Sequence, residues 1–171
     1  MKYLLLMRHA NSVSGTKDVS DHDRMLSDRG LSACARVGAL LAPEPCAAEH
    51  VLCSSATRAR QTLTGVAIDA GWDLPAGKPT VEYDQRLYVA SCQQIIDAIR
   101  AIDDDVSRLM VVAHYPGLGD AARLLTAMGD ETQYAPLLES FPPAALARLE
   151  FSTGSWREIG PGGGVLSRFV A

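Results

Sequence analysis

The sequence predicts a three-layer α/β fold, in which helices cover both faces of a central sheet. Strand-like and helix-like patterns alternate along the chain, as they do in such folds. Two apolar runs, residues 3–7 and 107–113, have the length and the unbroken hydrophobicity of strands buried on both faces. With 171 residues, the chain has the size of one ordinary domain with a substantial core.

Capping residues mark where the expected helices begin and end. Ser27 suits the N-cap of the first helix, and Ser54-Ser55 precede a second helix that stops at Gly71. Residues 91–94 match a capping box, and Pro116 suits the first turn of a fourth helix that reaches about residue 128. In the first helix, these apolar residues keep helical spacing: Leu31, Cys34, Val37 and Leu41.

The expected strands are separated by these helices. They comprise residues 2–7, 50–53, 80–83 and 107–113, and then a hairpin of 145–151 and 156–159. The glycine-rich run 160–164 lacks the strand-to-helix setting of a phosphate loop, so residues 160–171 are predicted as a flexible tail. No repeat or linker interrupts the chain. We therefore expect one domain over residues 1–171.

Composition narrows the class of protein. Apolar residues make up 47% and charged residues 21%, a globular balance. The net charge of −4 argues against a nucleic-acid partner. The short apolar start runs directly into Arg8 without a cleavage region, which predicts a cytoplasmic protein with no membrane partner. Four cysteines lack metal or redox spacing and are expected to be reduced, packed thiols: Cys34, Cys46, Cys53 and Cys92.

Chemistry-bearing side chains follow three of the expected strands. Arg8 and His9 follow the first strand, Arg58 lies in the first turn of the helix after the second, and His114 follows the fourth. The carboxyl ends of parallel strands meet at one edge of a sheet, where α/β proteins bind ligands. Two arginines offer bidentate donors to phosphoryl oxygens, and helix N-termini add N–H groups. One histidine can then attack phosphorus while the other stabilises the transferring group.

These segments resemble the signature blocks of the histidine phosphatase superfamily, also called the phosphoglycerate mutase-like family. Its Arg-His-Gly block appears as Arg8-His9-Ala10, and its Ser-Ser…Arg-Ala-x-Gln-Thr block is complete in residues 54–62. Its late block, an apolar strand ending in His-Asn-Pro-Gly, appears in residues 111–117. Residues 21–27 with Gly30 are similar to a segment of SixA-type phosphohistidine phosphatases. The resemblance spans residues 2 to about 128.

The resemblance implies a phosphoglycerate mutase-like fold, with a mixed, mostly parallel sheet in which the first and fourth strands are neighbours. It implies that His9 is a nucleophile that forms a phosphohistidine intermediate, which water then hydrolyses. Arg8, Arg58 and His114 would bind the phosphoryl oxygens, so no metal or cofactor is needed. His9 must be neutral to attack, so a hydrogen bond should fix its tautomer. Further contacts with the substrate would come from Arg24, Asp21, Ala10 and Ser14.

Two departures from the family pattern bear on the substrate. Ala10 replaces a glycine, which adds a methyl group where the backbone passes the phosphate. For a proton donor, the chain offers only Glu82 and Asp84 at the end of the third strand. Strand alternation places both on the same face, so direction does not separate them. Either carboxylate can equally be a solvated charge at a strand end with no catalytic function. An imidazole leaving group needs less acid help than an alkoxide. This favours phosphohistidine in a protein over a phosphate ester, as does the lack of a long insertion that could form a lid.

Three alternatives stay open beside this interpretation. One is a phosphatase of a small phosphate monoester, and another is a non-catalytic phosphate-binding regulatory module, although binding alone does not require His9. The third is a metal-dependent hydrolase, although no close ligand pair such as His-x-x-x-His supports it. Its candidate ligands are His9, His22, His114, Asp21 and Asp23.

Overall fold

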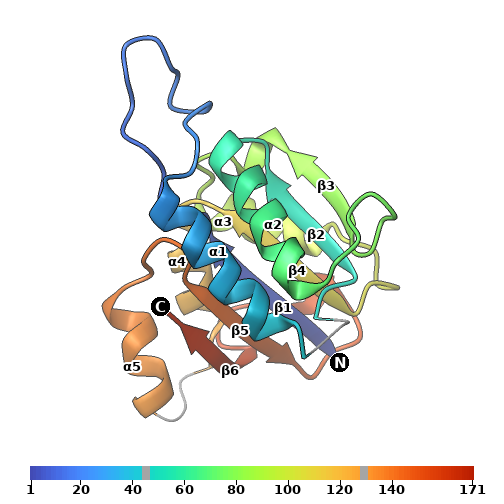
Figure 1. Ribbon diagram of the computed structural model, residues 1–171. Coiled ribbons are helices and arrows are strands. Elements are labelled where there is room, and N and C mark those ends of the chain that lie inside the picture. Colours follow the sequence, from blue (N-terminus) through green and yellow to red (C-terminus); the bar gives the residue numbers. More distant parts are fainter. Residues whose placement is uncertain (44–46, 128–130) are drawn as a thin grey trace.

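A computed structural model gives the arrangement of the chain, and it describes residues 1–43, 47–127 and 131–171, the last range without the side chains of 131–133. Six strands form one sheet in the order β3-β2-β4-β1-β5-β6 (Figure 1). The pairs β3–β2, β2–β4 and β4–β1 are parallel, and β1–β5 and β5–β6 are antiparallel. The mixed sheet and the β1–β4 pair confirm the predictions. The strands are β1 Lys2–Arg8, β2 His50–Ser54, β3 Thr80–Asp84, β4 Arg108–Ala113, β5 Leu146–Phe151 and β6 Gly164–Val170.

Helices cover both faces of this sheet, as the predicted three-layer fold requires. Helices α1 (Asp28–Leu41) and α2 (Thr57–Ala70) lie side by side on one face (Figure 1). Helices α3 (Cys92–Arg100) and α4 (Gly117–Leu125) pack together on the other. A further helix, α5 (Glu131–Glu139), packs against α4 and β6 and was not expected from the sequence.

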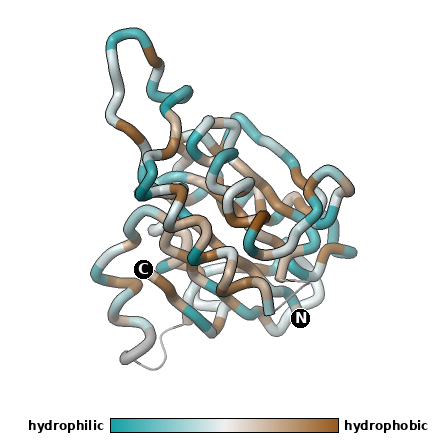
Figure 2. Tube along the Cα trace, in the orientation of Figure 1, coloured by the Kyte–Doolittle hydropathy of each residue, from teal (hydrophilic) through white to brown (hydrophobic). Residues whose placement is uncertain are grey.

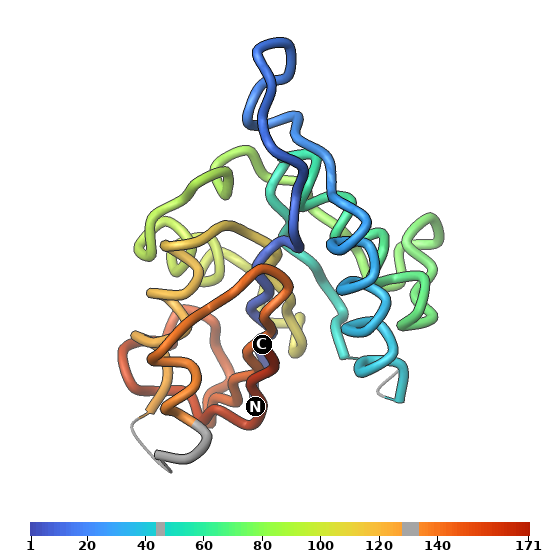
Figure 3. The backbone as a smooth tube through the Cα atoms, turned by 60° about the vertical axis from the view of Figure 1, so that its left-hand side comes forward, coloured from blue at the N-terminus to red at the C-terminus, as the bar shows by residue number. Residues whose placement is uncertain are grey.

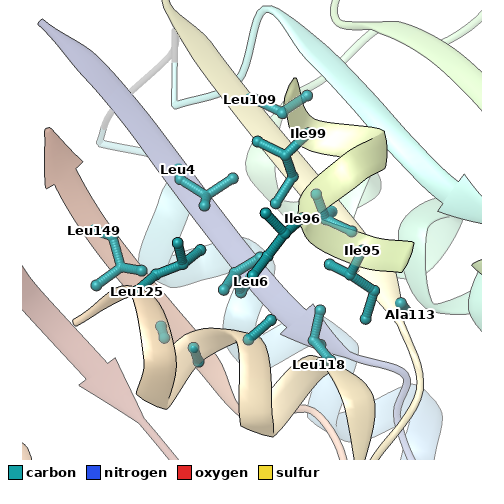
Figure 4. Packing of buried hydrophobic residues seen from close by; sticks show 14 of the residues in the cluster. Leu4, Leu6, Ile95, Ile96, Ile99, Leu109, Ala113, Leu118, Leu125 and Leu149 are labelled. Atoms are coloured by element: carbon teal, nitrogen blue, oxygen red, sulfur yellow. The ribbon is translucent and has the colours of Figure 1, made fainter. Parts of the chain in front are cut away.

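Strand alternation divides the core into two layers. Leu4 and Leu6 of β1 belong to the cluster beneath α3 and α4, which Figure 4 shows at close range. Leu5 and Met7 point the other way, into the cluster beneath α1 and α2. All four side chains are at most 4% exposed, so β1 is buried on both faces, as its unbroken apolar run predicted.

Most of the predicted caps are present. Ser27 accepts a hydrogen bond from the Gly30 N–H, Ser91 forms a capping box, and Gly71 ends α2 with a positive φ of 71°. The N-cap of α2 is Ala56, which makes no side-chain cap bond, instead of either serine before it. Leu31 keeps helical spacing but is half exposed, because it lies at the edge of the buried face of α1.

The C-terminal segment corrects two expectations. Residues 156–159 do not form a strand, because the Trp156 indole is buried in the core and its Nε1–H donates to the Val106 carbonyl at 2.8 Å. They instead contain a short 3₁₀ helix, Trp156–Glu158. Residues 164–170, predicted as part of a flexible tail, form β6 and pair with β5. Gly164 is needed there because a Cβ atom would lie 2.7 Å from the Phe151 ring.

Two further segments also depart from expectation. Helix α4 ends at Leu125, three residues before the predicted end, and Met128 lies outside the described residues. Residues 12–26 project from the body of the molecule at the end of the sheet (Figure 3). Figure 2 shows hydrophobic residues interspersed along this projecting segment, and Val13, Val19 and Met25 are exposed there. Among the described helices, none is long and apolar enough to cross a membrane.

Candidate active site

The two histidines named from the sequence lie side by side at the carboxyl ends of β1 and β4. Parallel pairing of these strands places Arg8 opposite Ala113, so the residues that follow, His9 and His114, meet at the sheet edge. Their ring centroids are 5.0 Å apart. Arg58, from the first turn of α2, contacts both rings. The strand-end argument therefore located three of these residues correctly in space.

The surroundings of His9 fix its tautomer. Its Nδ1 lies 2.8 Å from the carbonyl oxygen of Ala10, and because a carbonyl only accepts, Nδ1 carries the proton. Nε2 therefore has the free lone pair, and it accepts a hydrogen bond from Arg58 Nε at 3.3 Å. Burial, with a smaller contribution from Arg58, lowers the pKa of His9 to about 4. The ring is thus a neutral base with Nε2 facing a guanidinium.

The surroundings of His114 fix the opposite tautomer, with the proton on Nε2. Arg58 Nη2 donates to its Nδ1 at 3.3 Å, so the proton lies on Nε2, which donates to Ser54 Oγ at 2.8 Å. The same hydroxyl accepts the N–H of Ala56 at the start of α2. Burial, the proximity of His9 and the charge of Arg58 lower the pKa of His114 to about 3. His114 therefore presents Nδ1 to the site, while its Nε2 is held by Ser54.

Asp21, in the projecting segment, bonds to the arginines of the site. Its carboxylate lies 3.1 Å from Arg58 Nη2 and 2.9 Å from Arg24 Nη1, and it accepts the hydroxyl of Tyr88 at 2.5 Å. Its backbone carbonyl accepts Arg58 Nη1 at 2.6 Å. The bonds from Tyr88 and Arg24 hold the pKa of Asp21 well below its ordinary value. A carboxylate thus neutralises the cations that would otherwise face a phosphoryl group.

Arg8 flanks the histidines from the α4 side. Its Nη1 donates to the Phe141 carbonyl at 2.9 Å, and its guanidinium lies 5.0 Å over the Tyr115 ring. Its Nε is buried and has no hydrogen-bond partner among the described residues. Burial lowers the pKa of Arg8. This buried donor is therefore unsatisfied in the free protein, as far as the described residues show.

The other predicted contact residues differ in their positions. Arg24 reaches the site through Asp21 and is braced by Ser12 and by the Val13 carbonyl. Ser14 is exposed, and no contact links it to the histidines within the described residues. The methyl group of Ala10 points into the core beneath α1 and α2, so it does not narrow the site in the way its position in the motif suggested.

Neither candidate proton donor contacts His9 or His114 within the described part of the chain. Asp84 is buried and accepts both the backbone N–H of Arg86 at 2.7 Å and its guanidinium at 2.8 Å. These bonds lower the pKa of Asp84, which is the opposite of what a general acid needs. Glu82 is exposed and lies 3.7 Å from His50, at the start of β2.

Three residues of the site were missed or misread in the sequence. Ser54 anchors His114 with the same hydroxyl that accepts the Ala56 N–H, and Thr62 accepts the Ala10 N–H at 2.9 Å. Tyr88 packs edge-on against both His114 and His22, with ring centroids 5.4 Å and 5.0 Å away. Because Tyr88 follows the third strand, the strand-end rule that found His114 could also have found it.

The five candidate ligands of the metal-dependent alternative do not form a ligand set. Within the described ranges, no group of three or more His, Cys, Asp or Glu side chains is arranged to hold a metal ion. His22 instead contacts Ser55 at 2.9 Å, and Asp23 accepts the Ser20 hydroxyl.

The lowered pKa values of the two histidines predict how stability depends on pH. An unfolded chain protonates both near pH 6.5, whereas the folded chain keeps them neutral until about pH 4 and pH 3. The unfolded state therefore binds more protons below pH 6.5, and the free energy of unfolding must fall as the pH is lowered. We expect urea midpoints to decrease from about pH 7 to about pH 5. The double variant His9→Gln, His114→Gln should show a shallower decrease; an unchanged slope would contradict the assigned pKa values.

The fold and the site define a phosphoryl-transfer protein of the histidine phosphatase class. The chain belongs to the histidine phosphatase superfamily (branch 1), whose family model matches residues 4–87. An uncharacterized protein of Mycobacterium tuberculosis, Rv1276c, is 36% identical over 165 residues, which cover 95% of this chain and 98% of the relative. An uncharacterized protein of Mycobacterium leprae, ML1117, is also 36% identical and aligns over 90% of this chain and 91% of its own.

Solved structures show the same fold. A candidate phosphohistidine phosphatase SixA from Nakamurella multipartitia superimposes with a TM-score of 0.83 at 28% identity, covering 99% of this chain and 95% of its own. A SixA complexed with tungstate superimposes with a TM-score of 0.76 at 19% identity, over 99% of this chain and 96% of its own. These similarities confirm the predicted fold class and the resemblance to the histidine phosphatase superfamily.

Proposed function

We propose that the protein is a metal-independent phosphatase that acts through a covalent phosphohistidine on His9, and that its substrate is phosphohistidine in another protein. The observation that carries this proposal is the state of His9: neutral, with its Nδ1 proton committed to Ala10 and its Nε2 lone pair 3.3 Å from Arg58. A neutral imidazole held in one tautomer is a competent nucleophile at neutral pH.

In the first step, Nε2 of His9 attacks phosphorus. A new P–N bond forms as the bond to the substrate's imidazole nitrogen breaks, and that nitrogen takes up a proton from solvent water. The substrate phosphoryl group would displace Asp21 from Arg58, since both anions need the same guanidinium. Arg58, the free Nε of Arg8 and a protonated His114 would then donate to the phosphoryl oxygens.

In the second step, a water molecule attacks the phosphorus of the phosphorylated His9. The P–Nε2 bond breaks and inorganic phosphate leaves, which restores the neutral imidazole. The dianion beside His114 raises the pKa of that ring relative to the free protein, so a proton can reside on Nδ1 while phosphate is bound. Ser54 keeps the ring oriented in both states because it contacts Nε2.

Two observations support phosphohistidine as the substrate. Asp84 and Glu82 are engaged elsewhere, and a leaving imidazole needs little acid help. The fold similarity to proteins described as phosphohistidine phosphatases points the same way. Of the four cysteines, Cys46 lies outside the described residues, and Cys34, Cys53 and Cys92 are free thiols, which suits the cytoplasm as the location we propose.

A substrate panel with and without chelator tests this proposal. We expect a phosphohistidine peptide to be hydrolysed with a higher kcat/KM than an aryl phosphate, and a sugar phosphate to be the poorest substrate. Excess EDTA should leave all rates unchanged, because arginines supply the positive charge. Loss of activity with EDTA that a divalent ion restores would support the metal-dependent alternative. Preference for the sugar phosphate would support the monoester alternative, and no turnover at all would support the regulatory module.

A further inference from the structure

Arginines that have no partner among the described residues lie on the face of the sheet that carries α1. Arg29 and Arg36 lie on α1 about two turns apart, and both are exposed. Arg168 of β6 lies opposite Arg148 of β5, which in turn lies opposite Leu5 of β1. Directly opposite residues of antiparallel strands point to the same face. Since Leu5 packs beneath α1 and α2, Arg168 faces the α1 side as well.

These three side chains, called the arginine face below, carry uncompensated charge. Over the described ranges, Arg29, Arg36 and Arg168 make no side-chain hydrogen bond or ion pair, whereas Arg148 lies 3.7 Å from Glu150. The protein as a whole has a net charge of −4. The arginine face is therefore a local positive surface on an acidic protein, which attracts acidic partners.

A groove of about 420 Å³ lies beside Arg29 and Arg36 of the arginine face, between α1 and residues 142–144. Arg29 and Arg36 line it on one side, and Pro142, Pro143 and Val170 line it on another. None of the described side chains that line it is acidic, although the C-terminal residue Ala171, which carries the terminal carboxylate of this chain, also lines it. Apolar walls beside two cations suit a peptide segment that combines apolar and acidic side chains.

The groove adjoins the candidate active site. Asn11 and Ala144 line one end of it, and the Ala144 N–H donates to the carbonyl of His9 at 3.2 Å. In Figure 1, β6 extends beyond the edge of α1, and no helix lies in front of it. A partner seated in the groove therefore lies next to the segment whose backbone bonds to that of His9.

We propose that the arginine face docks an acidic segment of the protein whose phosphorylated residue reaches His9. That the phosphorylated residue is a histidine rests on the proposed function. The docking contact itself depends only on ion pairs between carboxylates of the partner and the arginines of this face. Docking here would fix the partner's orientation relative to the site and speed its capture through long-range attraction.

Binding of a labelled, unphosphorylated, glutamate-rich peptide tests the docking without any catalysis. We expect fluorescence anisotropy to show binding at low ionic strength that weakens as salt screens the charges. The variant Arg29→Glu, Arg36→Glu should weaken binding about tenfold or more, since reversal replaces attraction by repulsion. Its matched control is Lys78→Glu, Arg157→Glu, which changes the net charge equally at exposed residues outside the groove. The same peptide with glutamine for glutamate should not bind.

Each outcome decides the proposal. Equal binding to the two charge-reversed variants, no binding to the unmodified protein, or tighter binding of a single-stranded oligonucleotide than of the peptide would overturn it. Both variants should retain turnover of an aryl phosphate, which shows that they fold. Hydrolysis of phosphohistidine attached to the acidic peptide is measured in parallel. If the peptide binds at the arginine face and is not hydrolysed, the docking stands and the proposed substrate is wrong.

Discussion

His9→Ala is expected to abolish turnover, lowering kcat by about 10⁴-fold or more, as removal of a nucleophile does in other covalent mechanisms. The reason is geometric: Nε2 is the atom with a free lone pair at the meeting point of both histidines and Arg58. Phosphate should still bind, because Arg58 and His114 remain. Brief reaction with a radiolabelled phosphohistidine peptide should leave acid-labile, base-stable label on the unmodified protein and none on the variant.

His50→Ala is the matched control for this experiment. His50 begins β2, at the opposite end of the strand from Ser54, and its Nε2 lies 3.7 Å from Glu82. The control should therefore accumulate label and turn over substrate as the unmodified protein does. Label on the His9→Ala variant, or near-normal activity in it, would rule out covalent catalysis by His9.

The positions of the central site residues follow from local sequence rules. An unbroken apolar run identifies a strand buried on both faces, and the residue after it must lie at the sheet edge. This is sufficient to bring His9 and His114 together once β1 and β4 pair in parallel. Arg58 follows by the same logic, because it lies in the first turn after β2.

What the sequence could not show depends on contacts between distant segments. No periodicity links Asp21, in an irregular projecting segment, to Arg58, and their ion pair exists only after α2 has packed against the sheet. Likewise β6 starts in a glycine-rich run, and only its pairing with β5 makes it a strand. Ser54 was read as part of a cap because serine is common at helix starts, and nothing in the sequence indicates that its hydroxyl also accepts a hydrogen bond from His114.

Asp21 gives the free protein a distinctive electrostatic state. Its carboxylate bonds to Arg58, Arg24 and Tyr88 at once, so the cations are satisfied before any substrate arrives. A substrate phosphoryl group must exchange with this carboxylate, and it can do so because it offers more oxygens and more charge. Of the two arginines bonded to Asp21, Arg58 contacts both His9 and His114, whereas Arg24 contacts neither among the described residues, so substitutions of the two can be compared.

Arg58→Lys is expected to lower kcat/KM by about 10²–10³, the effect of losing a preorganised donor to the transferring group. One guanidinium now contacts His9 Nε2 at 3.3 Å, His114 Nδ1 at 3.3 Å and Asp21 Oδ2 at 3.1 Å. A lysine ammonium keeps the charge but has a single nitrogen, so it cannot span the three partners. The loss should therefore appear in kcat as well as in KM.

Arg24→Lys is the control, because Arg24 also bonds to Asp21, at 2.9 Å, but contacts neither histidine among the described residues. It should cost less than about tenfold in kcat/KM, in keeping with the loss of an exposed ion pair. Measuring both variants on an aryl phosphate and on a phosphohistidine peptide separates a role in chemistry from a role in binding one substrate. If the two variants lose the same activity, the bridge between Asp21 and the arginines matters and the contact of Arg58 with the histidines does not. A greater loss in Arg58→Lys on both substrates would place its guanidinium against the transferring phosphoryl group itself.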